Sequence, residues 1–147
     1  RYEFDSIGVP YCDAVPNSTG ATGHINATGS RSAASNDVLL SVEHLPANAF
    51  GFFLTSMTTG DVFPVAGSMG RLCLGGAPGR YVGPGQAQNS GATGSFQLQI
   101  DLTSMPTPTG LVPVAPGDTW SFQAWHRDAI AGVATSNFTD AITVTFE

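Results

Sequence analysis

Hydrophobic and polar residues alternate along several short segments of the chain. In residues 95–102, for example, Phe96 and Leu98 lie on one face and the polar residues between them on the other. A period of two is typical of a half-buried β-strand, and a short continuous apolar run is typical of a more deeply buried one. The remaining segments of these two kinds are residues 38–43, 49–56, 71–74, 118–127 and 141–146. No window of the sequence has the spacing of an amphipathic helix.

Clusters of Gly, Pro, Ser, Thr and Asn separate these segments and predict turns and loops. The clearest clusters are residues 75–79, 83–85 and 106–110. Residues 14–35 are small, polar and weakly patterned, and predict no element. The pattern as a whole predicts a single all-β domain over residues 1–147, an antiparallel β-sandwich or jelly roll of about eight strands.

Composition excludes several classes of protein. Only 11% of the 147 residues are charged, and the net charge is −6, because five Arg and no Lys stand against eleven Asp and Glu. A chain without a basic stripe is not expected to bind nucleic acid. The hydrophobic content of 41% is too high for a disordered chain. No apolar run approaches the length of about 18 residues that a membrane span needs, so none is expected.

The first residues, Arg1 to Asp5, do not resemble a signal peptide, which is expected of a mature, processed N-terminus. Tyr2 and Phe4 alternate with Glu3 and Asp5, as in a strand. An N-terminal strand that completes the sheet of a neighbouring copy is one route to a polymer. A weakly charged surface also lowers the repulsion between copies.

Cys12 and Cys73 are the two cysteines of the chain, and no Cys-x-x-Cys motif is present. Metal-binding and thioredoxin-like interpretations therefore have no support. The pair forms either a disulfide or two buried thiols. The polar, weakly charged composition is typical of an extracellular protein and favours the disulfide, which would contribute about 4 kcal/mol in the chain-entropy model.

Three Asn-x-Ser/Thr motifs place candidate glycosylation sites at Asn17, Asn26 and Asn137. The alternative is turn chemistry, in which the Asn and Thr side chains bind the local backbone. The richness of the chain in Ser and Thr favours the second interpretation, since chance alone supplies one or two such motifs.

Several motifs together resemble a known family. They are Tyr11-Cys12, Asn17-Ser18-Thr19-Gly20, Asn36 to Leu40, Leu45-Pro46, Phe50 to Leu54, Gly70 to Gly76, Pro116 to Asp128 and Ser136 to Asp140. Their order is similar to that of an uncharacterised domain of large secreted bacterial proteins, where it is common at the C-terminus. The resemblance implies an extracellular all-β module and no particular reaction. His126 departs from the family, in which an aromatic residue is more frequent, and this argues against a catalytic role for it.

The histidines His24, His44 and His126 do not have the spacing of a metal site. Glu43 and His44 are neighbours on a predicted strand, so their side chains are expected on opposite faces. We therefore expect no metal and no cofactor. Calcium could be held by aspartates in loops or at strand ends, but turn capping is the simpler interpretation for them. These aspartates are Asp13, Asp37, Asp118, Asp128 and Asp140.

Ser68 lies in Ala66–Gly70, which approaches the nucleophile elbow of hydrolases but lacks its first Gly and its α/β surroundings. The glycine-rich loops near residues 75–85 lack the Lys and the following helix that phosphate binding requires. Eleven acidic residues include no pair that the sequence selects for glycoside hydrolysis. The chain is therefore not expected to be an enzyme.

Residues 125–128 are the most informative candidate for ligand binding. Trp120 shares the core face with Phe122, which places Trp125 on the opposite face. There, Trp125 together with Tyr81 would stack a sugar ring while Arg127 and Asp128 bind its hydroxyl groups. The alternative is a second buried layer in which Arg127 and Asp128 form a structural ion pair.

The predicted function is a non-enzymatic extracellular structural or interaction module, as in a cell-surface or filament-forming subunit. Its expected partners are further copies of the chain or other extracellular proteins, joined through sheet edges and apolar loops. The alternative is a carbohydrate-binding module that uses its exposed aromatic side chains to bind a polysaccharide.

Overall fold

The computed structural model describes residues 5–147, so the strand expected around Tyr2 and Phe4 lies outside the described residues. The strands are β1 (Ser6–Ile7), β2 (Val9–Tyr11), β3 (His24–Gly29), β4 (Val38–Glu43), β5 (Phe50–Ser56), β6 (Thr59–Val62), β7 (Leu72–Leu74), β8 (Gly79–Arg80), β9 (Gln88–Asn89), β10 (Phe96–Ile100), β11 (Met105–Thr107), β12 (Gly110–Val112), β13 (Thr119–Ile130) and β14 (Val133–Thr145). One short 3-10 helix, η1 (Ala33–Ser35), interrupts them. No helix in this part of the chain has the length and apolar character to cross a membrane.

The fold is all-β, as the sequence predicts, with more strands than expected. Fourteen strands lie in residues 5–147, and seven of them have four or more residues. The other seven have only two or three residues. Apart from β7, which the sequence predicts, these short strands lie mostly in segments with Gly or Pro whose composition indicates loops, and the alternation therefore predicts only about eight strands.

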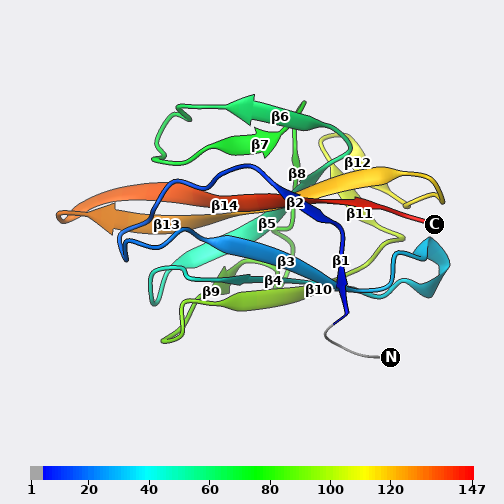
Figure 1. Ribbon diagram of the computed structural model, residues 1–147, viewed down its shortest axis with the longest axis horizontal. Helices are drawn as coiled ribbons and strands as arrows, with labels where there is room; N and C mark the ends of the chain where they lie inside the picture. The colour runs from blue at the N-terminus through cyan, green and yellow to red at the C-terminus, as the bar shows by residue number, and fades with distance from the viewer. Residues whose placement is uncertain (1–4) are drawn as a thin grey trace.

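Two antiparallel sheets form a β-sandwich (Figure 1). One sheet has the order β1-β3-β4-β10, and the other β2-β14-β13-β5-β8 with β9 also paired to β5. The turn between β13 and β14 has positive φ at Ala131 and Gly132, the backbone geometry that closes a two-residue hairpin. This hairpin extends along the long axis of the molecule and ends at the left of Figure 1.

The main core lies between the two sheets. Trp120, Phe122 and Ala124 of β13 all belong to it, which confirms the face assigned to them from the alternation. From the facing sheet come Ile25, Leu40 and Ile100, among others. Phe53 and Phe96 meet edge to face, with ring centroids 5.3 Å apart.

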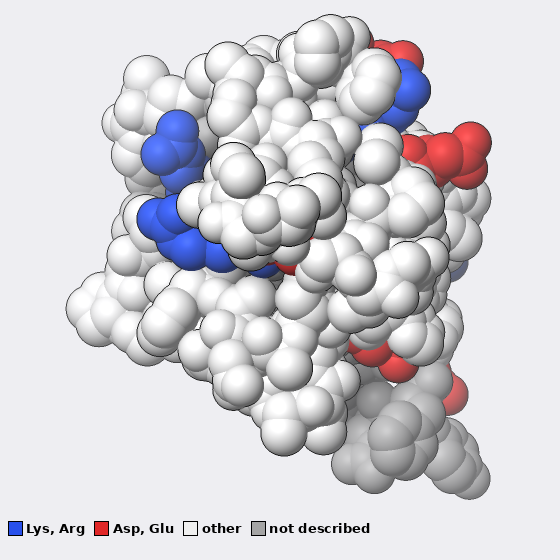
Figure 2. Space-filling model, turned by 90° about the vertical axis from the view of Figure 1, so that its left-hand side faces the viewer, with Lys and Arg blue, Asp and Glu red and all other residues white. Residues whose placement is uncertain are grey.

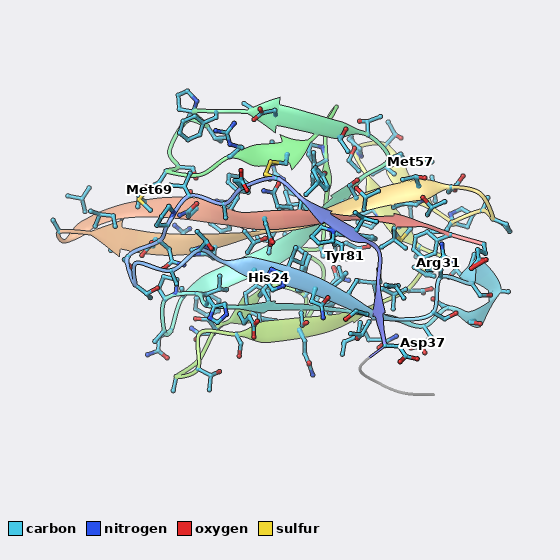
Figure 3. The ribbon with its side chains drawn as sticks, viewed as in Figure 1. His24, Arg31, Asp37, Met57, Met69 and Tyr81 are labelled. Carbon is cyan, nitrogen blue, oxygen red and sulfur yellow. A yellow bond between two sulfur atoms is a disulfide. The ribbon has the colours of Figure 1, made fainter. Side chains whose placement is uncertain are left out.

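A second, smaller layer covers part of the outer face of the β13 sheet. It consists of the β6–β7 hairpin and the loop between its strands. The predicted disulfide is confirmed: Cys12, which follows β2, is bonded to Cys73 in β7, with a Cα–Cα distance of 6.3 Å (Figure 3). The Tyr11 hydroxyl also donates to the Cys73 carbonyl at 2.7 Å. The covering layer is therefore tied to the beginning of the described chain.

Candidate functional site

A row of aromatic side chains crosses the outer face of the β13 sheet. Trp125 of β13 is paired with Phe52 of β5 on one side and Phe138 of β14 on the other. Partners in register share a face, so the three rings lie side by side. The ring centroids of Phe52 and Trp125 are 5.0 Å apart at an angle of 32°.

Two arginines flank this row along the strands. Arg80 of β8 is paired with Leu54, two residues from Phe52 on one side. On the other side, Arg127 follows Trp125 by two residues, and its guanidinium carbon lies 5.5 Å from the centre of the Trp125 ring. Because alternate residues share a face, both arginines belong to the same outer surface as the aromatic row.

The covering layer is held against the sheet by the buried side chain of Gln123. Its Oε1 accepts from the Cys73 N–H at 2.9 Å, and its Nε2 donates to the carbonyls of Arg71 at 2.8 Å and Thr139 at 2.7 Å. Gln123 precedes Trp125 by two residues, so the layer covers one side of the aromatic row and leaves Trp125 only partly buried.

A groove of about 480 Å³ remains between the sheet and its covering layer, and we call it the aromatic groove. Its lining residues are Phe52, Leu54, Val65, Leu72, Ala77, Pro78, Arg80, Trp125 and Phe138. Apart from the guanidinium of Arg80 and the indole N–H of Trp125, these side chains are apolar. Such a site is suited to the burial of an apolar group beside a charged one.

The arginines at the aromatic groove differ from the other two that the structure describes. Arg31 binds Glu147 at 3.2 Å, and Arg71 binds Asp61 at 2.7 Å. Arg80 and Arg127 form no ion pair with any residue of the described chain. Figure 2 shows that most of the surface at the hairpin end is uncharged and that its acidic atoms lie mainly on one side. The aromatic groove therefore has uncompensated positive charge on a protein of net charge −6.

Arg127 and Asp128 do not form the ion pair of the alternative interpretation. The Asp128 carboxylate accepts the backbone N–H groups of Ser18 and Ala129, each at 2.8 Å. Neighbouring residues of a strand point to opposite faces, and this separates the two side chains. Trp125 matches neither alternative fully, since it is half-buried and packs against Phe52 while Arg127 lies over its ring.

The prediction of Tyr81 as a stacking platform is also wrong. Its side chain is 2% exposed and belongs to the main core. The Tyr81 N–H donates to the Phe53 carbonyl at 2.9 Å, which draws this residue into the sandwich, and its hydroxyl donates to the Met105 Sδ at 3.5 Å. Burial, and secondarily the charge of Asp101, raises the pKa of this hydroxyl.

The three candidate glycosylation sites differ in accessibility. Asn17 is 4% exposed and donates to the His44 carbonyl at 2.8 Å, while Asn137 is fully buried and donates to the Val15 carbonyl at 2.9 Å. The side-chain oxygens of these two asparagines make the local backbone contacts of the alternative interpretation: Asn17 Oδ1 accepts the Thr19 N–H at 2.9 Å, and Asn137 Oδ1 accepts the Phe138 N–H at 2.7 Å. Asn26 is partly exposed, and its Nδ2 lies 3.5 Å from the Ser6 hydroxyl oxygen.

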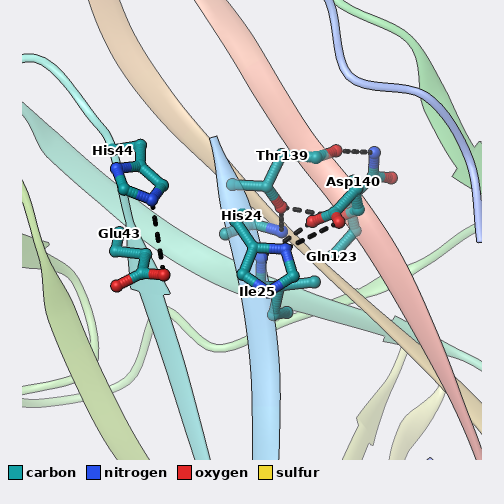
Figure 4. A network of polar contacts seen from close by, with 8 residues as sticks. His24, Ile25, Glu43, His44, Gln123, Thr139 and Asp140 are labelled. Atoms are coloured by element: carbon teal, nitrogen blue, oxygen red, sulfur yellow. Dashed lines mark hydrogen bonds and ion pairs between the residues drawn. The ribbon is translucent and has the colours of Figure 1, made fainter. Parts of the chain in front are cut away.

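A bulge positions a network of polar contacts outside the aromatic groove. The pairing of β13 with β14 shifts between Gln123 and Trp125, so that Thr139 and Asp140 oppose Ala124. The Asp140 carboxylate then accepts from the Ile25 N–H at 2.7 Å and lies 2.9 Å from His24 Nδ1 (Figure 4). This contact ties β14 to the opposite sheet. His24 and Glu43 also line a polar groove of about 470 Å³.

Glu43 and His44 are not on opposite faces as expected. His44 follows the end of β4 with a φ of 65°, and this turn brings its Nε2 to 3.4 Å from a Glu43 oxygen (Figure 4). Within residues 5–147, no three His, Cys, Asp or Glu side chains gather in a way that could hold a metal ion. The Asp118 carboxylate accepts from the Ala115 N–H at 2.8 Å, which is the turn-capping role.

Of the residues that line the groove, the sequence predicts only Trp125 as a site residue, and Phe52 and Arg80 are among those that it misses. The alternation in β5 does place Phe52 and Leu54 on one face, but only the register with β8 and β13 brings them beside Arg80 and Trp125. Comparison of the chain with protein-family models, with curated proteins and with the solved structures gives no match.

Proposed function

We propose that this chain is a non-enzymatic extracellular interaction module that holds a segment of another protein in the aromatic groove. The observation that carries the proposal is an apolar groove lined by Phe52 and Trp125, with Arg80 in its lining and Arg127 over the Trp125 ring. Neither arginine forms an ion pair within the described chain. An apolar pocket with a few convergent polar groups is the usual form of a binding site.

The lining of the groove favours a protein segment over a sugar. A sugar ring needs several polar side chains for its hydroxyl groups, and this lining is mainly aliphatic and aromatic. The Trp125 ring already packs against Phe52 and lies beneath Arg127, so it is not an open platform. An apolar side chain entering between Leu72 and Trp125 would instead remove further apolar surface from water.

The extracellular location is supported by chemistry that suits an oxidising compartment. The Cys12–Cys73 bond is a structural disulfide between separate layers of the fold, and such bonds persist mainly outside the cytosol. The low content of charged residues agrees with this location.

The non-enzymatic character is supported by the structural roles of the candidate nucleophile and bases. The Ser68 hydroxyl donates to the Ser136 carbonyl at 3.0 Å and accepts the Gly70 N–H at 3.1 Å. His24 pairs with Asp140, and His126 is fully buried with its Nδ1 2.9 Å from the Arg127 carbonyl. Each side chain thus stabilises a turn or a strand contact in a different part of the fold.

The test compares the protein with a variant whose groove is filled. Ala77 is exposed and lines the groove, so Ala77→Trp obstructs it without disturbing the core. Ala92→Trp, at an exposed loop position that does not line the groove, is the matched control. Both variants and the parent protein are screened against a displayed library of random peptides and against a glycan array, and their molar masses are measured by sedimentation.

We expect peptides that bind the parent and Ala92→Trp but not Ala77→Trp. Binding that is insensitive to Ala77→Trp would overturn the groove as the site. Glycans that bind in the groove, with no peptide doing so, would replace the proposal by the carbohydrate-binding alternative. Self-association that Ala77→Trp abolishes would support the proposal and identify the bound segment as part of a second copy.

A further inference from the structure

We infer that the segment bound in the aromatic groove is acidic, with a large apolar side chain between its carboxylates, and that Arg80 and Arg127 select it. This inference rests on the proposed function and deepens it by naming the chemistry of the partner.

The two arginines bracket the apolar part of the groove. Arg80 shares a row with Leu54, and Arg127 lies two residues beyond the Trp125–Phe52 row on the opposite side of β5. Their α-carbons are thus separated by four residues along the strand direction, roughly 13 Å, and by two strands across the sheet, roughly 10 Å. An extended peptide of similar length that passes over Phe52 can present one carboxylate to each arginine.

The charge of the site has no internal counterpart. The lining includes no acidic residue. Asp128 lines the neighbouring hollow together with Arg127, but its carboxylate accepts the Ser18 and Ala129 N–H groups and forms no ion pair with Arg127. Guanidinium groups bind carboxylates through two parallel hydrogen bonds, which gives direction as well as charge preference. The chain as a whole is acidic, with a net charge of −6, so these borders are a local exception that an acidic partner complements.

Synthetic peptides test the inference directly. The first is acetyl-Ser-Asp-Gly-Phe-Gly-Asp-Ser-amide, whose two carboxylates lie four residues apart around one aromatic side chain. The second replaces both Asp by Asn, and the third replaces Phe by Ser. An oligogalacturonate supplies carboxylates on a sugar backbone. Each is titrated into the ¹⁵N-labelled protein, and dissociation constants are obtained from the amide shifts of residues at the groove.

The protein variants are Arg80→Gln, Arg127→Gln and the double variant, with Arg31→Gln as the matched control. Arg31 is paired with Glu147 at the end of the molecule away from the β13–β14 turn (Figure 3). An exposed ion pair contributes about a two- to fivefold change in affinity, so Arg80→Gln and Arg127→Gln should each weaken the binding of the acidic peptide by that factor. The Asn peptide should bind the parent protein weakly, and its affinity should be no lower for the double variant. Added salt should weaken only the acidic peptide.

The possible results separate this inference from the proposed function. Equal affinity for the Asp and Asn peptides, with both blocked by Ala77→Trp, would overturn the acidic preference and leave the groove as a peptide site. Absence of groove shifts with the acidic peptide would overturn the inference. Arginine-dependent binding of the oligogalacturonate alone would overturn it in favour of an anionic polysaccharide. A loss in Arg31→Gln equal to that in Arg80→Gln would show that only the net charge matters, and would also overturn it.

Discussion

Replacement of Gln123 by Leu should weaken the attachment of the covering layer that forms one wall of the aromatic groove. The amide of Gln123 makes three buried hydrogen bonds, to the Cys73 N–H and to the carbonyls of Arg71 and Thr139. Leu has a similar volume but no polar atom, so one donor and two acceptors lose this partner. A buried backbone group left without a partner costs about 1–3 kcal/mol. Part of this loss is offset by the apolar side chain, and we expect a net destabilisation of about 3–5 kcal/mol.

The measurement is urea-induced unfolding of the oxidised protein, combined with amide hydrogen exchange of β7. The Cys73 amide should lose most of its protection, since its acceptor is removed, while amides of the main core change only through global stability. Gln97→Leu, at an exposed position of β10, is the matched control and should change stability by less than about 0.5 kcal/mol. If Gln123→Leu costs no more than this control, Gln123 does not hold the layer and the reasoning fails.

Three further predictions concern the disulfide, a buried histidine and glycosylation. Replacement of Cys12 and Cys73 by Ala should lower the unfolding free energy by about 4 kcal/mol, since the disulfide closes a loop with a sequence separation of 61. A parent protein whose denaturation midpoint is the same with and without reductant would contradict this prediction. Burial lowers the pKa of His126, so the unfolded chain binds a proton more readily than the folded protein. The unfolding free energy should therefore fall as the pH decreases from about 6.5 to the pKa of His126 in the folded protein, by at most about 1.4 kcal/mol per pH unit. His126→Leu should remove this part of the acid sensitivity, and a pH profile of stability that is the same in this variant would refute the assignment. Secretion from a glycosylating eukaryotic host should yield folded protein that is glycosylated only at Asn26, because Asn17 and Asn137 are buried. Peptide mass mapping that finds a glycan on Asn17 or Asn137 in the folded fraction would contradict this prediction.

Where alternation was strong, the sequence was sufficient to locate strands. Residues 95–102 and 118–127 correspond to β10 and most of β13, and Trp120 faces the core as predicted. β3 was missed because its side chains in the core are Ile25 and Ala27, and Ala27 is too small to give a hydrophobic signal. The first part of β14 was missed because its buried residues include polar ones, such as Asn137, that are satisfied by hydrogen bonds.

The candidate site was only partly accessible to the same reasoning. The alternation of side chains along β13 placed Trp125 and Arg127 away from the core. It could not show that they lie near Phe52 and Arg80, because that depends on the register between separate strands. Tyr81 was misassigned because nothing in its Gly-rich neighbourhood shows that its backbone joins β5. Tertiary register, rather than local pattern, therefore determines the groove.

The bond between Cys12 and Cys73 has a consequence for when the protein becomes competent to bind. One wall of the groove is contributed by β7, and the sulfur of Cys73 anchors that strand to the start of the described chain. In a reducing cytosol this anchor does not form, so the wall relies on apolar contacts and on hydrogen bonds such as those of Gln123 and Tyr11. We expect a newly made chain to acquire its full affinity only after export and oxidation, which would prevent premature capture of partners during biosynthesis.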